Sequence, residues 1–516
     1  MKEIAVISLS RYGDHIQSTP LLRILRRTYP QARITMVAEQ RFGDILPLMG
    51  GFDRHFLFDK KESAWKVVTE NDPIGPYLAM DSFVRQLEAD RYDLVINLTF
   101  TKLSAYLVSC MSAGRSTGIA ATATGQKVMN DPWGIYFFST LRGNNRRINR
   151  LNIVDIFTRV GGLMPDGRSV ELTPTTKGEM FAEEFLRAES LGNGPLVGIQ
   201  LGASEKNRCW PVESFASLSD HLQGELGCRT ILFGSPGEKD LADRARAAMR
   251  IPPIDAVGKT GIEELFSLVG RCRFLISNDT GTMHFAAAAG VPSIMLCIGP
   301  AFFQGTGPYL PGCLALVPAA PCYPCAYNHA CPAPLCRDQV SVDSAIAASS
   351  ILLGKTACPD FDTDGVRVYR SRFDDDGYLA WDNIHNPNRL EDTLADRYRA
   401  MWKYFLDHPQ GPIATPTAEA TRSLRSLMDQ GMEITAGILA ASARKPIPVE
   451  RIKELGEQEA ALEQKLKLLG IRRPELAPIV EYLTIMRENI AVEELGPVAA
   501  ATRKIYETGS YCAGLF

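Results

Sequence analysis

The sequence predicts an α/β protein with two doubly wound units, followed by a mostly α-helical segment. Continuous apolar strands alternate with helices within residues 1–175 and again within residues 190–355. This pattern is typical of parallel sheets that are covered by helices on both faces. Beyond a short extended segment, residues 365–516 show helical periodicity, which predicts a small bundle. With 516 residues, the chain has room for about three domains.

The first unit begins with a continuous apolar strand at residues 4–8. Thr19 and Pro20 suit the N-cap and the first position of a helix over residues 21–29. Further apolar runs predict strands at residues 34–37 and 94–98. Strands and helices in this order predict a parallel sheet.

A polar loop follows the first strand and contains Arg11, Gly13 and Asp14. In an open α/β sheet, ligands bind at the carboxyl ends of the strands, where this loop lies. A carboxylate in that place is suited to take a proton from a hydroxyl group as general base. The alternative is an ordinary loop with a solvated aspartate.

The second unit contains apolar runs that predict strands at residues 196–201, 229–233, 254–257, 274–277 and 293–298, with helices at 212–225, 238–249 and 262–270. The loop after the first of these strands contains Ser204, Lys206 and Arg208, ahead of Trp210. Small residues allow a ligand to approach the backbone, and two cations would attract a diphosphate. The alternative is a surface loop anchored by the tryptophan. The turn at residues 234–238 is also placed to face a nucleotide, although turns of this composition are common.

Residues 277–292 carry the most informative pattern in the chain. A buried strand ends at a polar turn containing Asp279 and Thr280, and a small-residue helix containing Gly281 and His284 starts at once. Such a turn directs free backbone N–H groups and the positive end of a helix dipole at a ligand. The sequence therefore predicts a site for a phosphate or a sugar hydroxyl.

Composition and missing motifs exclude several other classes of function. The 56 basic and 59 acidic residues give a net charge of −3, which argues against a nucleic-acid binder. A Gly-x-Gly-x-x-Gly dinucleotide fingerprint does not follow any predicted strand, and residues 258–261 lack the upstream glycine of a phosphate loop. The apolar part of the N-terminus is too short for a signal peptide, and no apolar run reaches the ~20 residues that a membrane span needs, so we expect a cytoplasmic protein.

Four of the twelve cysteines, Cys322, Cys325, Cys331 and Cys336, form what we call the cysteine cluster. Four converging thiolates would hold structural zinc or an iron–sulfur cluster. The spacing does not follow a standard zinc pattern, and the alternative is a cysteine-rich loop that stays reduced or holds a disulfide.

Three motifs in this order resemble those of the ADP-heptose:lipopolysaccharide heptosyltransferases, glycosyltransferase family 9. They are residues 4–14 with 19–22, residues 202–211, and residues 277–292; the segment 306–309 is also similar. The resemblance covers about residues 1–350 and implies a GT-B architecture with two Rossmann-like domains. It assigns the acceptor to the N-terminal domain, with Asp14 as base and Arg11 and Gly13 beside it. The donor would be held by Ser204, Lys206, Arg208, Asp279, Thr280, Gly281 and His284. Arg208 stands where the family usually has lysine.

The resemblance implies an inverting, metal-independent transfer of a heptose or related sugar from an ADP-sugar to a hydroxyl group. The acceptor would belong to the lipopolysaccharide core or another glycan, with a lipid-linked acceptor reached at the inner membrane surface. No cofactor would be required for the transfer. The alternatives are a transferase for a protein or another glycan that uses a different nucleotide sugar, and a catalytically silent nucleotide-sugar-binding scaffold.

Overall fold

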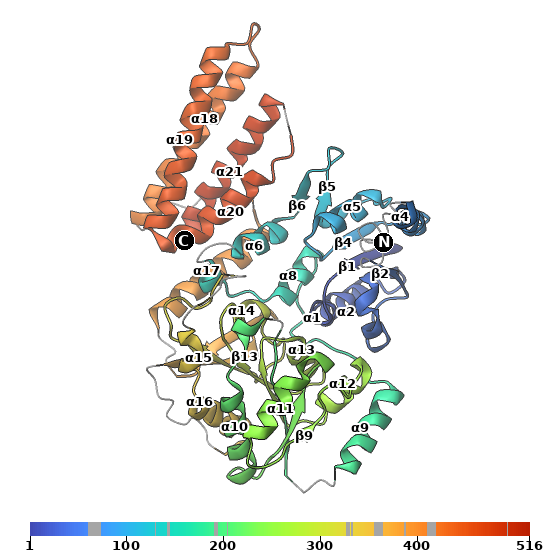
Figure 1. Ribbon diagram of the computed structural model, residues 1–516. Coiled ribbons are helices and arrows are strands. Elements are labelled where there is room, and N and C mark those ends of the chain that lie inside the picture. Colours follow the sequence, from blue (N-terminus) through green and yellow to red (C-terminus); the bar gives the residue numbers. More distant parts are fainter. Residues whose placement is uncertain are drawn as a thin grey trace. The chain divides into compact units, whose positions relative to one another are not determined.

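The computed structural model shows two sheets flanked by helices and a set of long C-terminal helices (Figure 1). It describes residues 1–59, 74–129, 131–141, 145–189, 194–203, 205–326, 331, 334–355, 365–385, 389–409, 419–492 and 494–515. Among these residues, no helix combines the length and the apolar character needed to cross a membrane.

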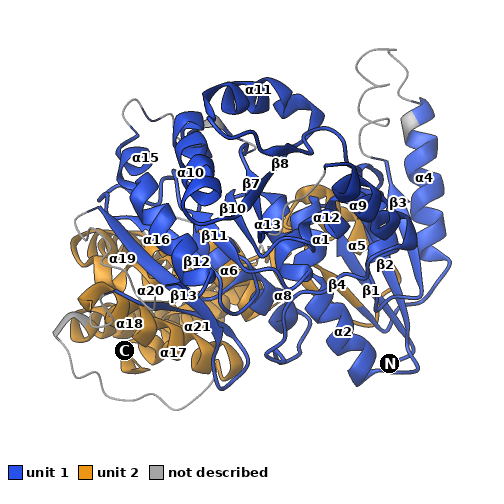
Figure 2. Cartoon of the chain, turned by 90° about the horizontal axis from the view of Figure 1, so that it is seen from below, with its two compact units in different colours: residues 1–94, 151–387 blue, residues 95–150, 388–516 orange. Residues whose placement is uncertain are grey.

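The chain forms two compact units, each built from segments that are separate in sequence (Figure 2). Unit 1 contains residues 1–94 and 151–387, and unit 2 contains residues 95–150 and 388–516. These limits differ from the domains expected from the sequence. Residues 1–175 contribute to both units, and residues 365–387 belong to unit 1 rather than to the helical extension.

Unit 1 begins with three strands that pair in parallel in the order β3-β2-β1: β1 (Glu3–Ser8), β2 (Arg33–Glu39) and β3 (Arg54–Phe58). The predicted loop after β1 is shorter than expected, because residues 12–17 form a helix, α1 (Tyr12–Gln17). Helix α2 (Thr19–Thr28) follows directly, and its N-cap is Ser18 instead of Thr19. Two further helical elements of this region are η1 (Gln40–Leu48) and α4 (Ile74–Glu88).

The second sheet of unit 1 has eight strands in the order β14-β13-β12-β11-β10-β7-β8-β9. All five predicted strands are present, as β7 (Leu196–Gln200), β8 (Arg229–Phe233), β9 (Ile254–Asp255), β10 (Phe274–Asn278) and β11 (Ser293–Leu296). They pair in parallel, as does β12 (Leu314–Pro318), which the sequence analysis did not identify. The predicted extended segment is an antiparallel hairpin, β13 (Val366–Phe373) and β14 (Leu379–Asn383), and it lengthens the same sheet.

The helices of this part of unit 1 are α8 (Ile153–Val160), α9 (Thr176–Ala188), α10 (Val212–Gly224), α11 (Lys239–Ala248), α12 (Ile262–Val269), α13 (Gly281–Ala288), α14 (Phe303–Thr306), α15 (Leu335–Gln339) and α16 (Val342–Leu352). The helices predicted at residues 212–225, 238–249 and 262–270 correspond to α10, α11 and α12.

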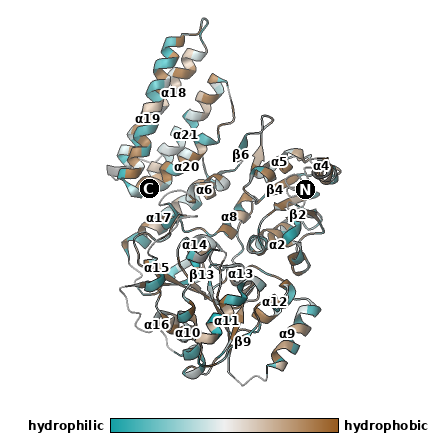
Figure 3. Cartoon of the chain, viewed as in Figure 1, coloured by the Kyte–Doolittle hydropathy of each residue, from teal (hydrophilic) through white to brown (hydrophobic). Residues whose placement is uncertain are grey.

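Unit 2 combines three strands of the six-stranded sheet with the C-terminal helices. Its N-terminal elements are β4 (Leu94–Asn97, whose first residue lies in unit 1), α5 (Lys102–Cys110), β5 (Ser116–Ala121), β6 (Lys127–Met129), α6 (Pro132–Thr140) and α7 (Asn145–Ile148). Its C-terminal helices are α17 (Leu390–Asp407), α18 (Glu419–Ser442), α19 (Val449–Arg472), α20 (Ala477–Glu488) and α21 (Leu495–Leu515). Both hydrophobic and hydrophilic residues recur along α18 and α19 (Figure 3), as is typical of amphipathic helices in a bundle.

The helical C-terminal segment is interrupted between α20 and α21. At the break, the Asn489 side chain accepts a hydrogen bond from the backbone N–H of Met129 (2.6 Å) and donates one to its C=O (2.8 Å). The asparagine thus pairs with the edge of β6, a contact distant in sequence that periodicity alone does not reveal.

An aromatic cluster joins the two segments of unit 2. Trp402 on α17 is 2% exposed, and its ring centroid lies 5.2 Å from that of Tyr136 on α6 and 5.1 Å from that of Tyr482 on α20. Trp133 on α6 donates its indole N–H to Asp407 Oδ1 at 3.2 Å. The C-terminal helices therefore share one core with residues 95–150.

Candidate functional site

The polar turn after β10 has the predicted strand–turn–helix form. Strand β10 ends at Asn278, Thr280 is the N-cap of α13, and the eight-residue helix α13 begins at Gly281. The hydroxyl groups of Ser277 and Thr280 lie 3.2 Å apart and fix the turn. The first N–H groups of α13 have no partner within the helix itself, so this end is suited to an anion.

Arg208 and Asp279, both predicted to hold the donor, form an ion pair. One guanidinium nitrogen of Arg208 lies 3.3 Å from Asp279 Oδ2, and another lies 3.4 Å from Glu205 Oε1. The Arg208 and Asp279 side chains are only 12% and 13% exposed. Asp279 therefore orients the cation of the preceding loop. Ser204 and the side chain of Lys206 lie outside the described residues.

A pocket of about 670 Å³ lies beside this turn, within the size range of small-molecule sites. Of the predicted donor residues, Thr280 and Gly281 line it. Tyr12 and Asp44, from the segment that contains β1 to β3, line it as well, and their side chains form a hydrogen bond of 3.1 Å. Burial, and next the hydrogen bond to Asp44, raise the pKa of Tyr12, so this phenol stays protonated.

A hydrogen-bonded chain that the sequence analysis did not identify forms one wall of the pocket. Thr282 donates its hydroxyl to Gln200 Oε1 at 2.8 Å, and Gln200 Nε2 donates to Glu238 Oε1 at 3.3 Å. The other carboxylate oxygen of Glu238 accepts the backbone N–H and the hydroxyl of Ser235, at 2.6 and 2.7 Å. A Cβ atom at Gly202 would lie 1.5 Å from Glu238 Oε1, so this carboxylate occupies space that only glycine leaves open. The turn at residues 234–238 was the one sequence feature that pointed here.

The predicted general base lies near the start of α1. Asp14 is half-buried, and its Oδ2 accepts the backbone N–H of Arg11 at 3.1 Å. Burial raises the pKa of Asp14 above its usual value, although the hydrogen bond from Arg11 and its charge act in the opposite direction. Arg11 is exposed, and its acceptor-side role stays a prediction.

Gly13 allows close approach of α1 and α13. A Cβ atom at Gly13 would lie 2.8 Å from Cδ2 of His284 on α13, so the imidazole packs directly on the glycine. His284 is 7% exposed, and burial lowers its pKa to about 4. The ring is therefore neutral at neutral pH, and its Nδ1 has no hydrogen-bond partner among the residues that the structure describes. Gly13, next to the predicted base Asp14, is thus in contact with His284, one of the residues predicted to hold the donor.

Three members of the cysteine cluster precede α15 in the chain, and the fourth, Cys336, lies within this helix. Among the residues described, none of these four cysteines forms a disulfide. Burial raises the pKa of Cys336, and the neighbouring Cys322 and Cys331 act in the same direction. The backbone N–H of Cys325 donates to Gly299 O at 3.1 Å. In the described part of the chain, no three His, Cys, Asp or Glu side chains are grouped as metal ligands. The metal content of the cluster stays a prediction.

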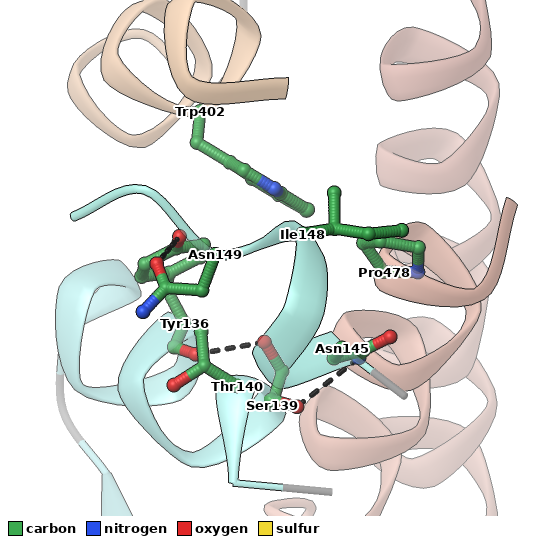
Figure 4. Close-up of a pocket in the computed structure, with 8 residues that line it drawn as sticks. All are labelled: Tyr136, Ser139, Thr140, Asn145, Ile148, Asn149, Trp402 and Pro478. Carbon is green, nitrogen blue, oxygen red and sulfur yellow. Dashed lines mark hydrogen bonds between the residues drawn. The ribbon is translucent and has the colours of Figure 1, made fainter. Parts of the chain in front are cut away.

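A second cavity, in unit 2, has a volume of about 10 Å³ (Figure 4), which is space for about one water molecule. It is lined by Tyr136, Ser139, Thr140, Asn145, Ile148, Asn149, Trp402 and Pro478. Tyr136 donates its hydroxyl to Asn149 Oδ1 at 2.6 Å, and Asn145 Nδ2 donates to Ser139 O at 3.1 Å. A space of this size belongs to the packing of the core and has no room for a substrate.

Comparisons with known proteins point to one family of glycosyltransferases. Residues 80–330 match the model of glycosyltransferase family 9 (heptosyltransferase). The chain is 26% identical over 296 residues to lipopolysaccharide heptosyltransferase 3 of Escherichia coli K12, which covers 55% of this chain and 79% of the relative. It is 24% identical over 295 residues to lipopolysaccharide heptosyltransferase 1 of Salmonella typhimurium, a match that covers 57% of this chain and 87% of the relative. Among solved structures, E. coli ADP-heptose lps heptosyltransferase II is similar in fold, with a TM-score of 0.51 at 19% identity, covering 69% of this chain and 99% of that one.

Proposed function

The chain belongs to glycosyltransferase family 9 and has a GT-B fold, and from this premise we propose that it transfers a heptose from ADP-heptose to a hydroxyl group of a lipopolysaccharide-core acceptor. We propose further that the transfer inverts the anomeric centre and needs no metal ion. One observation carries the proposal: Gly13, beside Asp14, packs against His284 on the helix whose first residue lines the pocket.

In this reaction the acceptor hydroxyl oxygen forms a bond to the anomeric carbon, while the bond from that carbon to the diphosphate breaks. The diphosphate leaves with the electron pair of the broken bond, and Asp14 takes the proton of the hydroxyl. A carboxylate with a raised pKa is a stronger base than an ordinary aspartate, which supports this role for Asp14.

The leaving group gains negative charge as the bond breaks. The guanidinium of Arg208 and the N–H groups at the start of α13 are positive groups fixed by the fold, since Asp279 holds the arginine. Such pre-oriented groups stabilise developing charge in the place that a metal ion takes in other transferases. The Glu238 carboxylate on the pocket wall supports binding of the hydroxyl groups of the donor.

We propose that the reaction takes place in the cytoplasm, at the inner surface of the membrane, where a lipid-linked acceptor is presented. A second acceptor class, a protein or a different glycan, is favoured by one feature. The C-terminal helices lie beyond the matched residues 80–330 and share a core with residues 95–150, part of the half expected to receive the acceptor.

The test is an assay of purified protein with ADP-heptose and a panel of acceptors: lipopolysaccharide cores truncated at successive sugars, other glycans and proteins. We expect ADP release with a core acceptor, the opposite anomeric configuration in the product by NMR, and full activity in EDTA. Thermal-shift measurements with ADP-, UDP- and GDP-sugars identify the donor independently of the acceptor. If none of these sugars raises the melting temperature, the proposed function is wrong.

A further inference from the structure

The loop that carries Arg208 is tied at both ends to one buried side chain. Asn278, the last residue of β10, is fully buried. Its Nδ2 donates to Leu201 O at 2.7 Å, where the loop leaves β7, and its Oδ1 accepts the backbone N–H of Trp210 at 3.0 Å, where the loop ends. A single carboxamide therefore closes the loop formed by residues 202–209.

Both sides of this loop are fixed by further contacts. Trp210 is 2% exposed, donates its indole N–H to Val340 O at 2.7 Å, and packs edge-on against Phe215 with ring centroids 4.9 Å apart. In addition, a Cβ atom at Gly299 would lie 2.6 Å from Asn207 O, so the turn at Gly299 packs directly against the loop. The backbone on either side of Arg208 is thus held in place.

Asn278 and its neighbour Asp279 act on the same loop at different points. Asn278 fixes the ends of the loop, and Asp279 fixes the guanidinium of Arg208 at 3.3 Å. We infer that Asn278 is a positioning residue for the transfer: through the two ends of the loop, it sets where the Arg208 charge meets the diphosphate of the donor. This inference rests on the proposed function.

The structure offers a matched control for Asn278. Asn97 is the last residue of β4, is also fully buried, and makes the same kinds of bond: its Nδ2 donates to Ile119 O at 2.8 Å, and its Oδ1 accepts the N–H of Thr99 at 3.0 Å. Loss of either carboxamide leaves buried backbone groups unpaired, so both changes destabilise the protein. Only Asn278 is tied to the loop of Arg208.

The experiment compares ADP with adenosine, which has no phosphate. Ligand affinities are measured by calorimetry for ADP and by ligand-observed NMR for adenosine, on Asn278→Ala, Asn97→Ala and the natural protein. Asn278→Ala is expected to weaken ADP binding about tenfold, equivalent to about 1.4 kcal/mol, and adenosine binding less than about twofold. Asn97→Ala is expected to change neither affinity. Asn278→Ser, a milder change, serves if the alanine variant does not fold, and should give a smaller loss in the same direction.

A double-mutant cycle separates positioning from general damage. In an Arg208→Ala background, Asn278→Ala should cause no further loss of ADP affinity, because Asn278 acts through that arginine. Equal losses for ADP and adenosine, or an undiminished effect without Arg208, would overturn the inference while leaving the proposed function intact. If the natural protein binds no ADP at all, the proposed function fails instead.

Discussion

Substitution of Gly202 by alanine tests whether the Glu238 carboxylate organises the pocket. The added Cβ would lie 1.5 Å from Oε1, 2.5 Å from Cδ and 3.1 Å from Cγ of Glu238, so the carboxylate has to leave its place. Gly202 does not have a positive φ, and the backbone itself accepts alanine. The effect of the substitution therefore comes from this one contact.

Displacement of the carboxylate breaks the bonds that Glu238 makes to Gln200 and Ser235. Gln200 is 4% exposed, so the amide left behind is buried. A buried donor without a partner costs about 1–3 kcal/mol. Glu238 also forms a capping box with Ser235 at the short 3-10 helix Pro236–Glu238, and loss of a helix cap costs about 1 kcal/mol. Glu238 is a flexible side chain that can turn toward solvent, so we expect a loss of about 2 kcal/mol in the free energy of unfolding, and weaker ADP binding.

The assay is urea denaturation, with ADP affinity measured in parallel by calorimetry. Gly237→Ala is the matched control, because it lies in the same turn and its added Cβ would meet only Ser235 Oγ, at 3.9 Å. In a Glu238→Ala background, Gly202→Ala should lower the free energy of unfolding clearly less than it does in the natural protein. The reasoning is refuted if the free energies of unfolding of Gly202→Ala and Gly237→Ala agree within about 0.5 kcal/mol and the two variants bind ADP equally.

Four other predictions follow from the structure. Asp14→Asn should abolish turnover without loss of stability at pH 7, measured as thermal melting followed by circular dichroism. The reason is that an aspartate whose pKa rises on folding destabilises the folded state when it is ionised. A clear loss of stability would contradict the raised pKa. Burial lowers the pKa of both His15 and His284 to about 4 in the folded protein. Each histidine should therefore reduce the free energy of unfolding as pH falls from about 6.5 to 4, by about 3 kcal/mol at pH 4. Urea midpoints measured across this pH range check the prediction. Trp402→Ala should lower the free energy of unfolding by about 3–5 kcal/mol, whereas Leu390→Ala, at a position 82% exposed, should change it by less than about 0.5 kcal/mol. If the cysteine cluster binds a metal, mass spectrometry of the purified protein should detect zinc or iron that is lost when its cysteines are replaced by serine; a metal-free protein purified without chelator would favour the reduced loop.

The parts of the fold that sequence predicted best are those with strong local patterns. Strand β10 and helix α13 were predicted nearly to the residue, because a continuous apolar run, a polar turn and Gly290 mark their limits. The hairpin β13–β14 was recognised as extended, but its place beside β12 was not. That place depends on pairing such as Leu314 with Arg370, between segments distant in sequence.

In the candidate site, too, the residues that follow a local sequence pattern were the ones that could be predicted. Asp14, Thr280 and Gly281 follow apolar strands directly, so their position at the edge of a sheet could be inferred from order alone. The role of Glu238 could not, because its carboxylate depends on Gln200 from another strand and on the space above Gly202. Pairing of Arg208 with Asp279 was likewise not predicted, since each was expected to face the donor by itself.

The discontinuous composition of unit 2 has a consequence for synthesis of the protein. Residues 95–150 leave the ribosome before the 237 residues numbered 151–387, and their aromatic partners on α17 and α20 come later still. At about 5–20 residues per second, this delay lasts about 12–47 s. During that time Trp133 and Tyr136 lack the side chains that bury them in the finished protein. A nascent chain stalled near residue 387 should therefore bind hydrophobic-surface chaperones more strongly than the full-length chain does.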